Sequence, residues 1–409
     1  MTVTHPAPTA ERALRQLRAH HAPALALLGK LAGAGAVEVA AEGCRVTLSD
    51  GREMLDFGSY AVTLLGHRHP DVVAAVHGQL DRMPTATRSL ANPVLAEAAA
   101  ALSAYVGLPR VWFGCNGTDA VEAALKLARL ASGRARILAV TGGFHGKTLG
   151  SLAATHHPRY RAGLDGVLGP VTHLDPADPA AADRALAEGD VAALVAEPVQ
   201  GENGVVPLPA DVLARWATAV RRAGGFVLAD EIQCGLRRCG PRTVAAADGV
   251  PVDAVLLGKP LGGGVLPLSA VVCTDDLYGP LLRDPSRHTA TFSGHPLSCA
   301  AVVPTLRALE DGAARIPVLE RVLSDGLHAL AARHPGAVTA VRGRGLLWGL
   351  DLASPEIAGA VLVDATQRGL LTSPCLGRPT TLRLLPPLVA EPADVHTALS
   401  ILDGVLPPT

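Results

Sequence analysis

A lone lysine, Lys259, follows the apolar run Ala254 to Leu257 and precedes a glycine-rich stretch. Four consecutive apolar residues indicate a buried strand, so the side chain of Lys259 is expected at the end of that strand. Burial there disfavours the charged amine, lowers its pKa and leaves a nucleophile. A second apolar run, at residues 225–229, ends in Asp230 and Glu231. A lysine and a carboxylate at two strand ends of one sheet indicate a Schiff-base cofactor site.

Residues 113–120 run from a predicted strand end through Gly114 and Gly117 into a helix with apolar residues at helical spacing. The start of a helix exposes backbone amides, which together with the hydroxyl of Thr118 suit a phosphate group. Asn116 or Thr118 is also a good N-cap residue, and capping does not exclude phosphate binding. This segment is therefore a candidate anion site.

Three further stretches carry polar groups next to predicted strands. Residues 143–148 could place Phe144 over a planar ring, whereas their Gly-Lys-Thr ending lacks the glycine spacing of an ATP-binding loop. Glu197 and Glu202 follow the apolar run 191–196, and Arg383 lies among apolar residues far along the chain. An ion pair at a domain interface would explain these charges equally well.

The elements that must position these groups alternate along the chain. Fully apolar runs between amphipathic helices predict an α/β fold, with a mostly parallel sheet that is covered on both faces. The predicted helices are 10–28, 72–80, 93–106, 118–130, 179–187, 210–223 and 296–309. The predicted strands are 137–140, 191–196, 226–229, 254–257 and 268–273, preceded by a strand pair over 37–48 that turns at 49–51. Ligands bind at the carboxyl ends of such strands, where Glu197, Asp230 and Lys259 fall.

The pattern changes after about residue 311. Helices are predicted at 318–333, 357–368 and 393–402, and strands at 337–342, 345–350 and 382–384, which together indicate an α+β C-terminal domain. The sequence thus divides into an N-terminal segment at 1–60, a large domain at 61–310 and a small C-terminal domain at 311–409.

Composition excludes several classes of function. The net charge of −1 and the aromatic content of 3% argue against nucleic-acid or anionic-membrane binding. Seven scattered cysteines, none in a C-x-x-C pair, argue against a disulfide framework and a metal site. The start of the chain has no signal pattern, and no apolar stretch is long enough to span a membrane. We therefore expect a cytoplasmic protein with reduced thiols.

Eight motifs in a fixed order make the combination specific. The sequence resembles the class III (ornithine/omega-amino-acid type) aminotransferases, which use pyridoxal 5'-phosphate and have the type I fold of pyridoxal-phosphate-dependent transferases. The resemblance covers roughly residues 50 to 390. Its motifs lie at 66–70, 117–118, 144–146, 197–202, 230–235, 259–264, 291–296 and Arg383.

The resemblance implies a role for each motif. Lys259 forms the Schiff base with the cofactor and then moves a proton between substrate carbon and cofactor, while Asp230 pairs with the ring nitrogen. The same comparison gives the remaining cofactor contacts as Gln233 on the ring hydroxyl, Phe144 on the ring face, His145 beside it, and Gly117 and Thr118 on the phosphate. Thr291 would reach the phosphate of a neighbouring subunit, which implies a homodimer with its active sites at the interface.

The substrate end departs from the family pattern. Cys115-Asn116-Gly117 replaces the usual Asn-Ser-Gly, and Lys147 replaces an arginine that grips a second carboxylate in many members. These features look most like the putrescine and diamine branch. Glu202 and Arg383 match the family's switch, in which the glutamate masks the arginine for an amine and releases it for an oxoacid. Tyr60 is expected near the substrate.

The sequence therefore predicts transfer of an amino group between a primary terminal amine and an oxoacid such as 2-oxoglutarate or pyruvate. The amine could be a diamine, an omega-amino acid or the product of a biosynthetic aldehyde. The alternative is an aminomutase, racemase or decarboxylase on the same scaffold, because one lysine and one electron-withdrawing ring serve all of these reactions.

Overall fold

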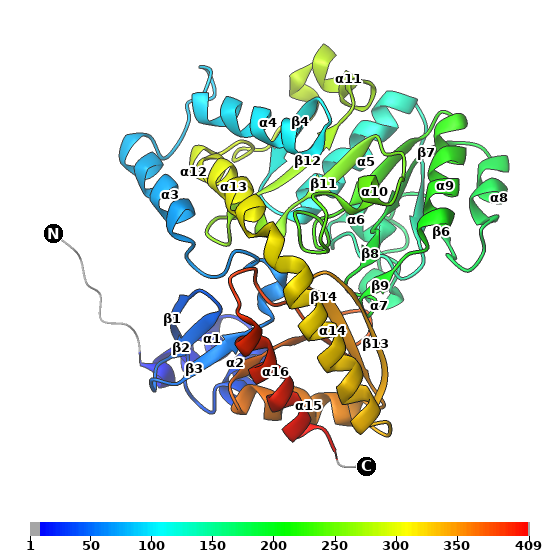
Figure 1. The fold of residues 1–409 in the computed structure, drawn as a ribbon. Helices are drawn as coiled ribbons and strands as arrows, with labels where there is room; N and C mark the ends of the chain where they lie inside the picture. Colours follow the sequence, from blue (N-terminus) through cyan, green and yellow to red (C-terminus); the bar gives the residue numbers. More distant parts are fainter. Residues whose placement is uncertain (1–8, 408–409) are drawn as a thin grey trace.

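The computed structural model describes residues 9–407, which form three sheets of four or more strands and the helices around them (Figure 1). At the N-terminus, the helix predicted over 10–28 is two helices, α1 (Ala10–His20) and α2 (Pro23–Ala32). Proline lacks the N–H that a helix interior uses and is favoured in the first turn, and Pro23 is the first residue of the second helix.

A small sheet follows these helices. Strands β1 (Glu38–Glu42) and β2 (Arg45–Leu48) are antiparallel. The turn predicted at 49–51 does not close this pair, because Gly43 lies between the two strands with a φ of 56°. Residues 49–51 instead connect β2 to β3 (Glu53–Asp56), which also pairs in antiparallel fashion.

The central sheet has seven strands, and its mostly parallel character was predicted correctly. Six strands run in one direction, and β12 is antiparallel to both of its neighbours. In spatial order the strands are β4 (Arg110–Gly114), β12 (Ser269–Cys273), β11 (Ala254–Leu257), β10 (Phe226–Asp230), β7 (Val191–Ala196), β5 (Arg136–Val140) and β6 (Val171–Leu174).

Helices cover both faces of this sheet. The apolar side of α5 (Gly117–Ser132) packs with α11 (Asp275–Arg283) on one face, where Ile137 and Ala139 of β5 point. On the other face, α8 (Ala181–Ala187) and α9 (Ala210–Arg222) pack on alternate strand residues such as Leu138. The remaining helices of this region are α3 (Pro70–Arg82), α4 (Pro93–Val106), α6 (Leu149–Ala154), α7 (Pro158–Arg161), α10 (Val244–Ala247), α12 (Pro296–Ala300) and α13 (Val302–Gly312).

Helix α14 (Ile316–Arg333) continues from α13 after a short 3₁₀ turn and leads away from the central sheet (Figure 1). The next elements form an antiparallel sheet in the order β13 (Val338–Arg344), β14 (Leu347–Leu352), β17 (Thr381–Leu384) and β16 (Ser373–Pro374), flanked by α15 (Pro355–Gln367) and α16 (Pro392–Val405). Strand β15 (Leu370–Leu371) pairs in parallel with β3, so the N-terminal and C-terminal segments share a sheet.

The strand register brings three chemically important residues to one edge. Asp230 is the last residue of β10 and lies opposite Leu256 of β11. Glu197 follows β7 directly, and Lys259 follows β11 after one glycine. Since β7, β10 and β11 are adjacent and parallel, these residues emerge at the same carboxyl edge. Within residues 9–407, no helix is both long and apolar enough to cross a membrane.

Candidate active site

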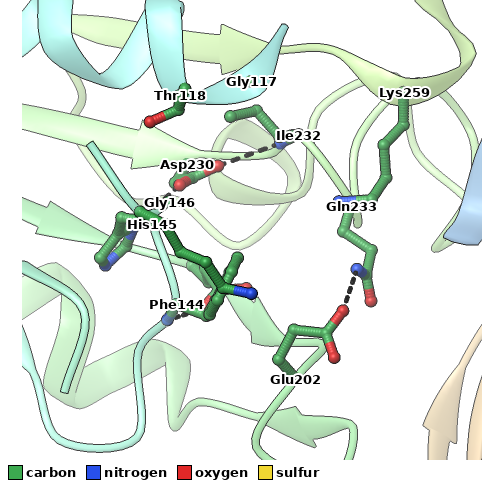
Figure 2. A pocket seen from close by; sticks show the side chains of 12 residues that line it. Gly117, Thr118, Phe144, His145, Gly146, Glu202, Asp230, Ile232, Gln233 and Lys259 are labelled. Atoms are coloured by element: carbon green, nitrogen blue, oxygen red, sulfur yellow. Dashed lines mark hydrogen bonds and ion pairs between the residues drawn. The ribbon is translucent and has the colours of Figure 1, made fainter. Parts of the chain in front are cut away.

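A cavity of about 320 Å³ opens at this edge of the central sheet (Figure 2). It is within the size range of small-molecule sites. Every site residue predicted from the sequence lines it except Arg383, Thr291 and Tyr60. The lining residues are Gly117, Thr118, Phe144, His145, Gly146, Lys147, Glu197, Glu202, Asp230, Ile232, Gln233 and Lys259.

Lys259 begins a 3₁₀ turn, η2 (Lys259–Gly262), and points into the cavity (Figure 2). Its φ of 39° is a left-handed conformation that a side chain adopts only when the surrounding structure enforces it. Burial lowers the pKa of the Lys259 amine, and the nearby guanidinium of Arg383 adds to the effect. The turn therefore presents an amine whose neutral, nucleophilic form is favoured.

Asp230 is held on both carboxylate oxygens. Its Oδ2 lies 2.8 Å from Nδ1 of His145, and its Oδ1 accepts a hydrogen bond from the backbone N–H of Ile232 at 3.2 Å. Although burial opposes the charged imidazole, the hydrogen bond with Asp230 raises the pKa of His145. The pair fixes a buried carboxylate at the wall of the cavity, where it can face a protonated ring nitrogen.

Glu197 orients the loop that carries Phe144. Its carboxylate accepts hydrogen bonds from the backbone N–H groups of Phe144 at 2.8 Å and Gly201 at 3.3 Å. Burial raises the pKa of Glu197 to about 7, and the charge of Asp230 contributes in the same direction. The carboxylate of Glu197 therefore fixes the backbone at Phe144 and Gly201.

At the start of α5, the structure distinguishes between Asn116 and Thr118 as the N-cap residue. The side chain of Asn116 accepts from the N–H of Asp119 at 3.3 Å, so Asn116 is the N-cap. Thr118 does not serve as the cap, and its hydroxyl lies 2.7 Å from that of Ser151 and 2.8 Å from that of Thr148. A helix start beside three hydroxyl groups is a fitting place for a phosphate.

The backbone at Gly146 packs directly against this hydroxyl cluster. A Cβ atom at this position would lie 2.3 Å from Oγ1 of Thr118 and 2.6 Å from Oγ of Ser151. Its φ of 133° is also one that other residues rarely adopt. Glycine is therefore required here both for space and for backbone conformation.

Arg383 contacts the cavity through Glu202. Arg383 lies on β17 with no exposed surface, and its Nη1 donates to Oε1 of Glu202 at 2.6 Å and to Oε1 of Gln233 at 3.0 Å. Glu202 also accepts from the backbone N–H of Leu376 at 2.8 Å. Burial opposes ionisation, but the guanidinium of Arg383 holds the pKa of Glu202 below its usual range. The two charged side chains form a buried ion pair.

Two predicted residues lie outside the cavity of this chain. Tyr60 is 64% exposed, and it belongs to the turn η1 (Ser59–Ala61), where all three residues have positive φ. Thr291 is exposed on a loop, where its carbonyl accepts from Arg88 at 3.0 Å. Neither residue is among those that line the cavity.

The structure also shows residues in or beside the cavity to which the sequence gave no role. Ser151 and Thr148 join the hydroxyl cluster, and Ile232 lies between Gly117 and the strand ends, with its side chain against a Cβ position of Gly117. The available signal was the position of Thr148 at the end of the 143–148 motif, with Ser151 three residues later. The donor set suits a phosphorylated heteroaromatic aldehyde such as pyridoxal phosphate: an amine, a carboxylate, an aromatic ring and a hydroxyl-lined helix start.

Comparison with known proteins agrees with this chemistry. The family model described as Aminotransferase class-III matches residues 34–406, a range that contains every residue lining the cavity. A putrescine aminotransferase of Pectobacterium atrosepticum is 36% identical over 368 residues, which are 87% of this chain and 79% of the relative. An acetylornithine aminotransferase of Mycolicibacterium smegmatis is 40% identical over 375 residues, 90% of this chain and 93% of the relative.

Solved structures share the whole fold. The ornithine aminotransferase of Toxoplasma gondii matches with a TM-score of 0.90 at 29% identity, covering 98% of this chain and 96% of that chain. An amine transaminase from an uncultivated Pseudomonas species, in its PLP-bound form, matches with a TM-score of 0.85 at 28% identity. The latter match covers 99% of this chain and 98% of that chain.

Proposed function

The chain belongs to the class-III aminotransferases, and from this family assignment we propose that it transfers the amino group of a primary terminal amine to an oxoacid. Pyridoxal 5'-phosphate is its cofactor. The names of the two relatives, putrescine and acetylornithine aminotransferase, support donors that carry the reacting amine at the end of an alkyl chain. The acceptor would be an oxoacid such as 2-oxoglutarate or pyruvate.

When bound, pyridoxal phosphate supplies an aldehyde that bonds to amines and a ring that stabilises negative charge on the neighbouring carbon. Lys259 is the residue that would hold this aldehyde covalently. When it does not hold the aldehyde, the Nζ of Lys259 would be the group placed to accept a proton from the substrate carbon and to return it. The lowered pKa of Lys259 supports both tasks, because each one begins from the neutral amine.

The other cavity residues would bind and orient the cofactor. The carboxylate of Asp230, fixed by His145, would keep the ring nitrogen protonated. Phe144 would lie on the ring face, and Gln233 would contact the ring hydroxyl. Gly117 and Thr118 would bind the phosphate through the start of α5. The positions of these residues around one cavity support this assignment.

Glu202 and Arg383 would let one cavity accept two different partners. With an amine donor, Glu202 keeps its ion pair and neutralises the buried guanidinium. With an oxoacid, Arg383 would turn to the substrate carboxylate while Glu202 remains held by the N–H of Leu376. Lys147 and Tyr60 would contact the part of the substrate farther from the reacting amine.

We further propose that the protein is a cytoplasmic homodimer. Thr291 and the neighbouring Phe292, which is 56% exposed, lie on a surface loop where they could complete the phosphate site of a second subunit. The sharing of a sheet between β3 and β15 supports grouping segment 1–60 with a small domain at 311–409, beside a large cofactor-binding domain at 61–310. All seven cysteines are free thiols, as a reducing compartment would leave them.

The convergence of Lys259 and Asp230 on one cavity from adjacent strand ends carries the proposal, and covalent trapping tests it. The chain contains only four lysines, at 30, 126, 147 and 259. After reconstitution with pyridoxal phosphate and borohydride reduction, we expect peptide mapping to place one cofactor on Lys259. Lys259→Ala should abolish both the trapping and glutamate formation from putrescine and 2-oxoglutarate, whereas Lys126→Ala should retain both. Stoichiometric trapping in Lys259→Ala would refute the assignment.

A further inference from the structure

Tyr160, on the short helix α7, contacts two residues that line the active-site cavity. The ammonium of Lys147 lies over the Tyr160 ring, with Nζ 4.7 Å from the ring centroid. The same ring meets Phe144 edge to face, with centroids 6.1 Å apart and an interplanar angle of 82°. Tyr160 does not itself line the cavity, so it acts on the site through these two neighbours.

The Tyr160 ring is anchored from the C-terminal part of the chain. Its hydroxyl donates to the carbonyl of Leu376 at 3.1 Å, and the N–H of Leu376 donates to Oε2 of Glu202 at 2.8 Å. The position of the ring is therefore set by the same segment that holds the Glu202–Arg383 pair. A ring fixed in this way provides a defined place for the Lys147 ammonium.

The Lys147 side chain is long, flexible and exposed, so only a specific contact can hold its ammonium at one position. The ammonium is closer to Tyr160 than to Phe144, whose centroid is 5.9 Å away. The guanidinium of Arg159 lies 5.8 Å from the same Tyr160 ring, so two cations share this aromatic group. A cation–π contact at an exposed position changes the ratio of ring-bound to released Lys147 ammonium by roughly two- to fivefold.

We propose that Tyr160 is a specificity-determining residue of the aminotransferase. By holding the Lys147 ammonium against its ring, Tyr160 withholds that charge from a carboxylate at the far end of a substrate. It also reduces the repulsion that a free Lys147 would exert on a far-end ammonium. The arrangement therefore favours diamines over omega-amino acids. This inference rests on the proposed function and names the substrate class of the same site.

Two donors of equal chain length test the inference: putrescine carries a far-end ammonium and 4-aminobutyrate a far-end carboxylate. We measure the ratio of their kcat/KM values in the holoenzyme. Tyr160→Leu should shift this ratio toward 4-aminobutyrate by about two- to fivefold, because the Lys147 ammonium is released. Tyr160→Phe keeps the ring but loses the hydroxyl bond to Leu376, so it should shift the ratio by less than Tyr160→Leu does. In a Lys147→Met background, Tyr160→Leu should leave the ratio unchanged.

A second measurement is independent of turnover. Calorimetric titration with glutarate, a dicarboxylate without an amine, should show about two- to fivefold tighter binding to Tyr160→Leu than to the parent holoenzyme. An unchanged glutarate affinity, or an equal shift of the donor ratio in the Lys147→Met background, would overturn the role of Tyr160. A shift as large in Tyr160→Phe would also overturn it. Lack of turnover with every donor would refute the proposed function instead, and the glutarate titration would still decide this inference.

Discussion

Replacement of Glu202 by glutamine isolates the charge of the buried ion pair while keeping the shape of the side chain. In the parent protein, Nη1 of Arg383 lies 2.6 Å from Oε1 of Glu202, and neither side chain is appreciably exposed. In Glu202→Gln, Arg383 keeps its hydrogen bond to Gln233 at 3.0 Å and its contact with Ser373 at 3.3 Å. The guanidinium would then be a buried cation without a counter-charge.

The size of the effect follows from this geometry. Breaking a buried ion pair by removing one partner costs about 3–5 kcal/mol, most of which is the free-energy cost of the uncompensated buried charge. The amide oxygen introduced by Glu202→Gln can still accept the hydrogen bond from Arg383, which should recover roughly half of that cost, since a hydrogen bond to a charged group contributes about 1.5–3 kcal/mol. The residual of about 2 kcal/mol corresponds to roughly 30-fold in an equilibrium constant. An oxoacid carboxylate would remove this penalty on binding, and an amine donor would not.

The assay follows the two half-reactions separately. The holoenzyme is mixed with putrescine alone, and the amine form of the enzyme is mixed with 2-oxoglutarate alone, while the cofactor absorbance is recorded. In Glu202→Gln we expect the apparent KM for 2-oxoglutarate to fall relative to that for putrescine, by about ten- to thirtyfold. Ser373→Ala is the matched control, because it removes a neutral contact of Arg383 and should change the two constants alike. Equal changes of both constants in Glu202→Gln would refute the reasoning that this pair distinguishes the two substrates.

Two further predictions concern the phosphate cluster and the stability of the fold. Gly146→Ala should weaken pyridoxal-phosphate binding at least about tenfold in a cofactor titration, because the added Cβ displaces the hydroxyls of Thr118 and Ser151. Gly163→Ala, at a φ of 79° with open space around its Cβ position, should leave the affinity unchanged. Burial raises the pKa of Glu231 to about 7, so its protonated form is favoured by folding and its contribution to stability is lost as the pH rises through 7. Urea unfolding between pH 5 and 7.5 should show a fall in stability of up to about 1.4 kcal/mol per pH unit from this group, and Glu231→Gln should remove that part of the fall.

The sequence predicted which strand-end residues come together, because their positions depend on the order and direction of the strands. Apolar runs located β7, β10 and β11, and in a parallel sheet the carboxyl ends of neighbouring strands share one edge. The candidates Asp230 and Lys259 therefore came together without knowledge of any loop. The resemblance to the family added the assignments of Gln233, Phe144 and Thr118, which also line the cavity.

The parts that the sequence did not predict depend on contacts between distant segments. Tyr160 reaches Leu376 over 216 positions, and Leu376 reaches Glu202 over 174. Such pairs leave no periodic pattern in the sequence. Two local elements also differ from the prediction. The helix predicted over 10–28 ends before Pro23, which begins a second helix. Residues 49–51 form a turn, as predicted, but this turn joins β2 to β3. The turn between β1 and β2 contains Gly43.

The buried ion pair also connects substrate choice to the reactivity of Lys259. Burial favours the neutral form of the Lys259 amine, the charge of Glu202 opposes this, and that of Arg383 supports it. Because the two opposite charges are joined at 2.6 Å, their effects on Lys259 largely cancel, and burial decides. An oxoacid carboxylate that binds Arg383 restores a similar balance, since it brings one negative charge next to the same guanidinium. Loss of the charge of Glu202 should therefore lower the pKa of Lys259 further, so the amine of Glu202→Gln should react with carbonyl reagents at lower pH than that of the parent protein.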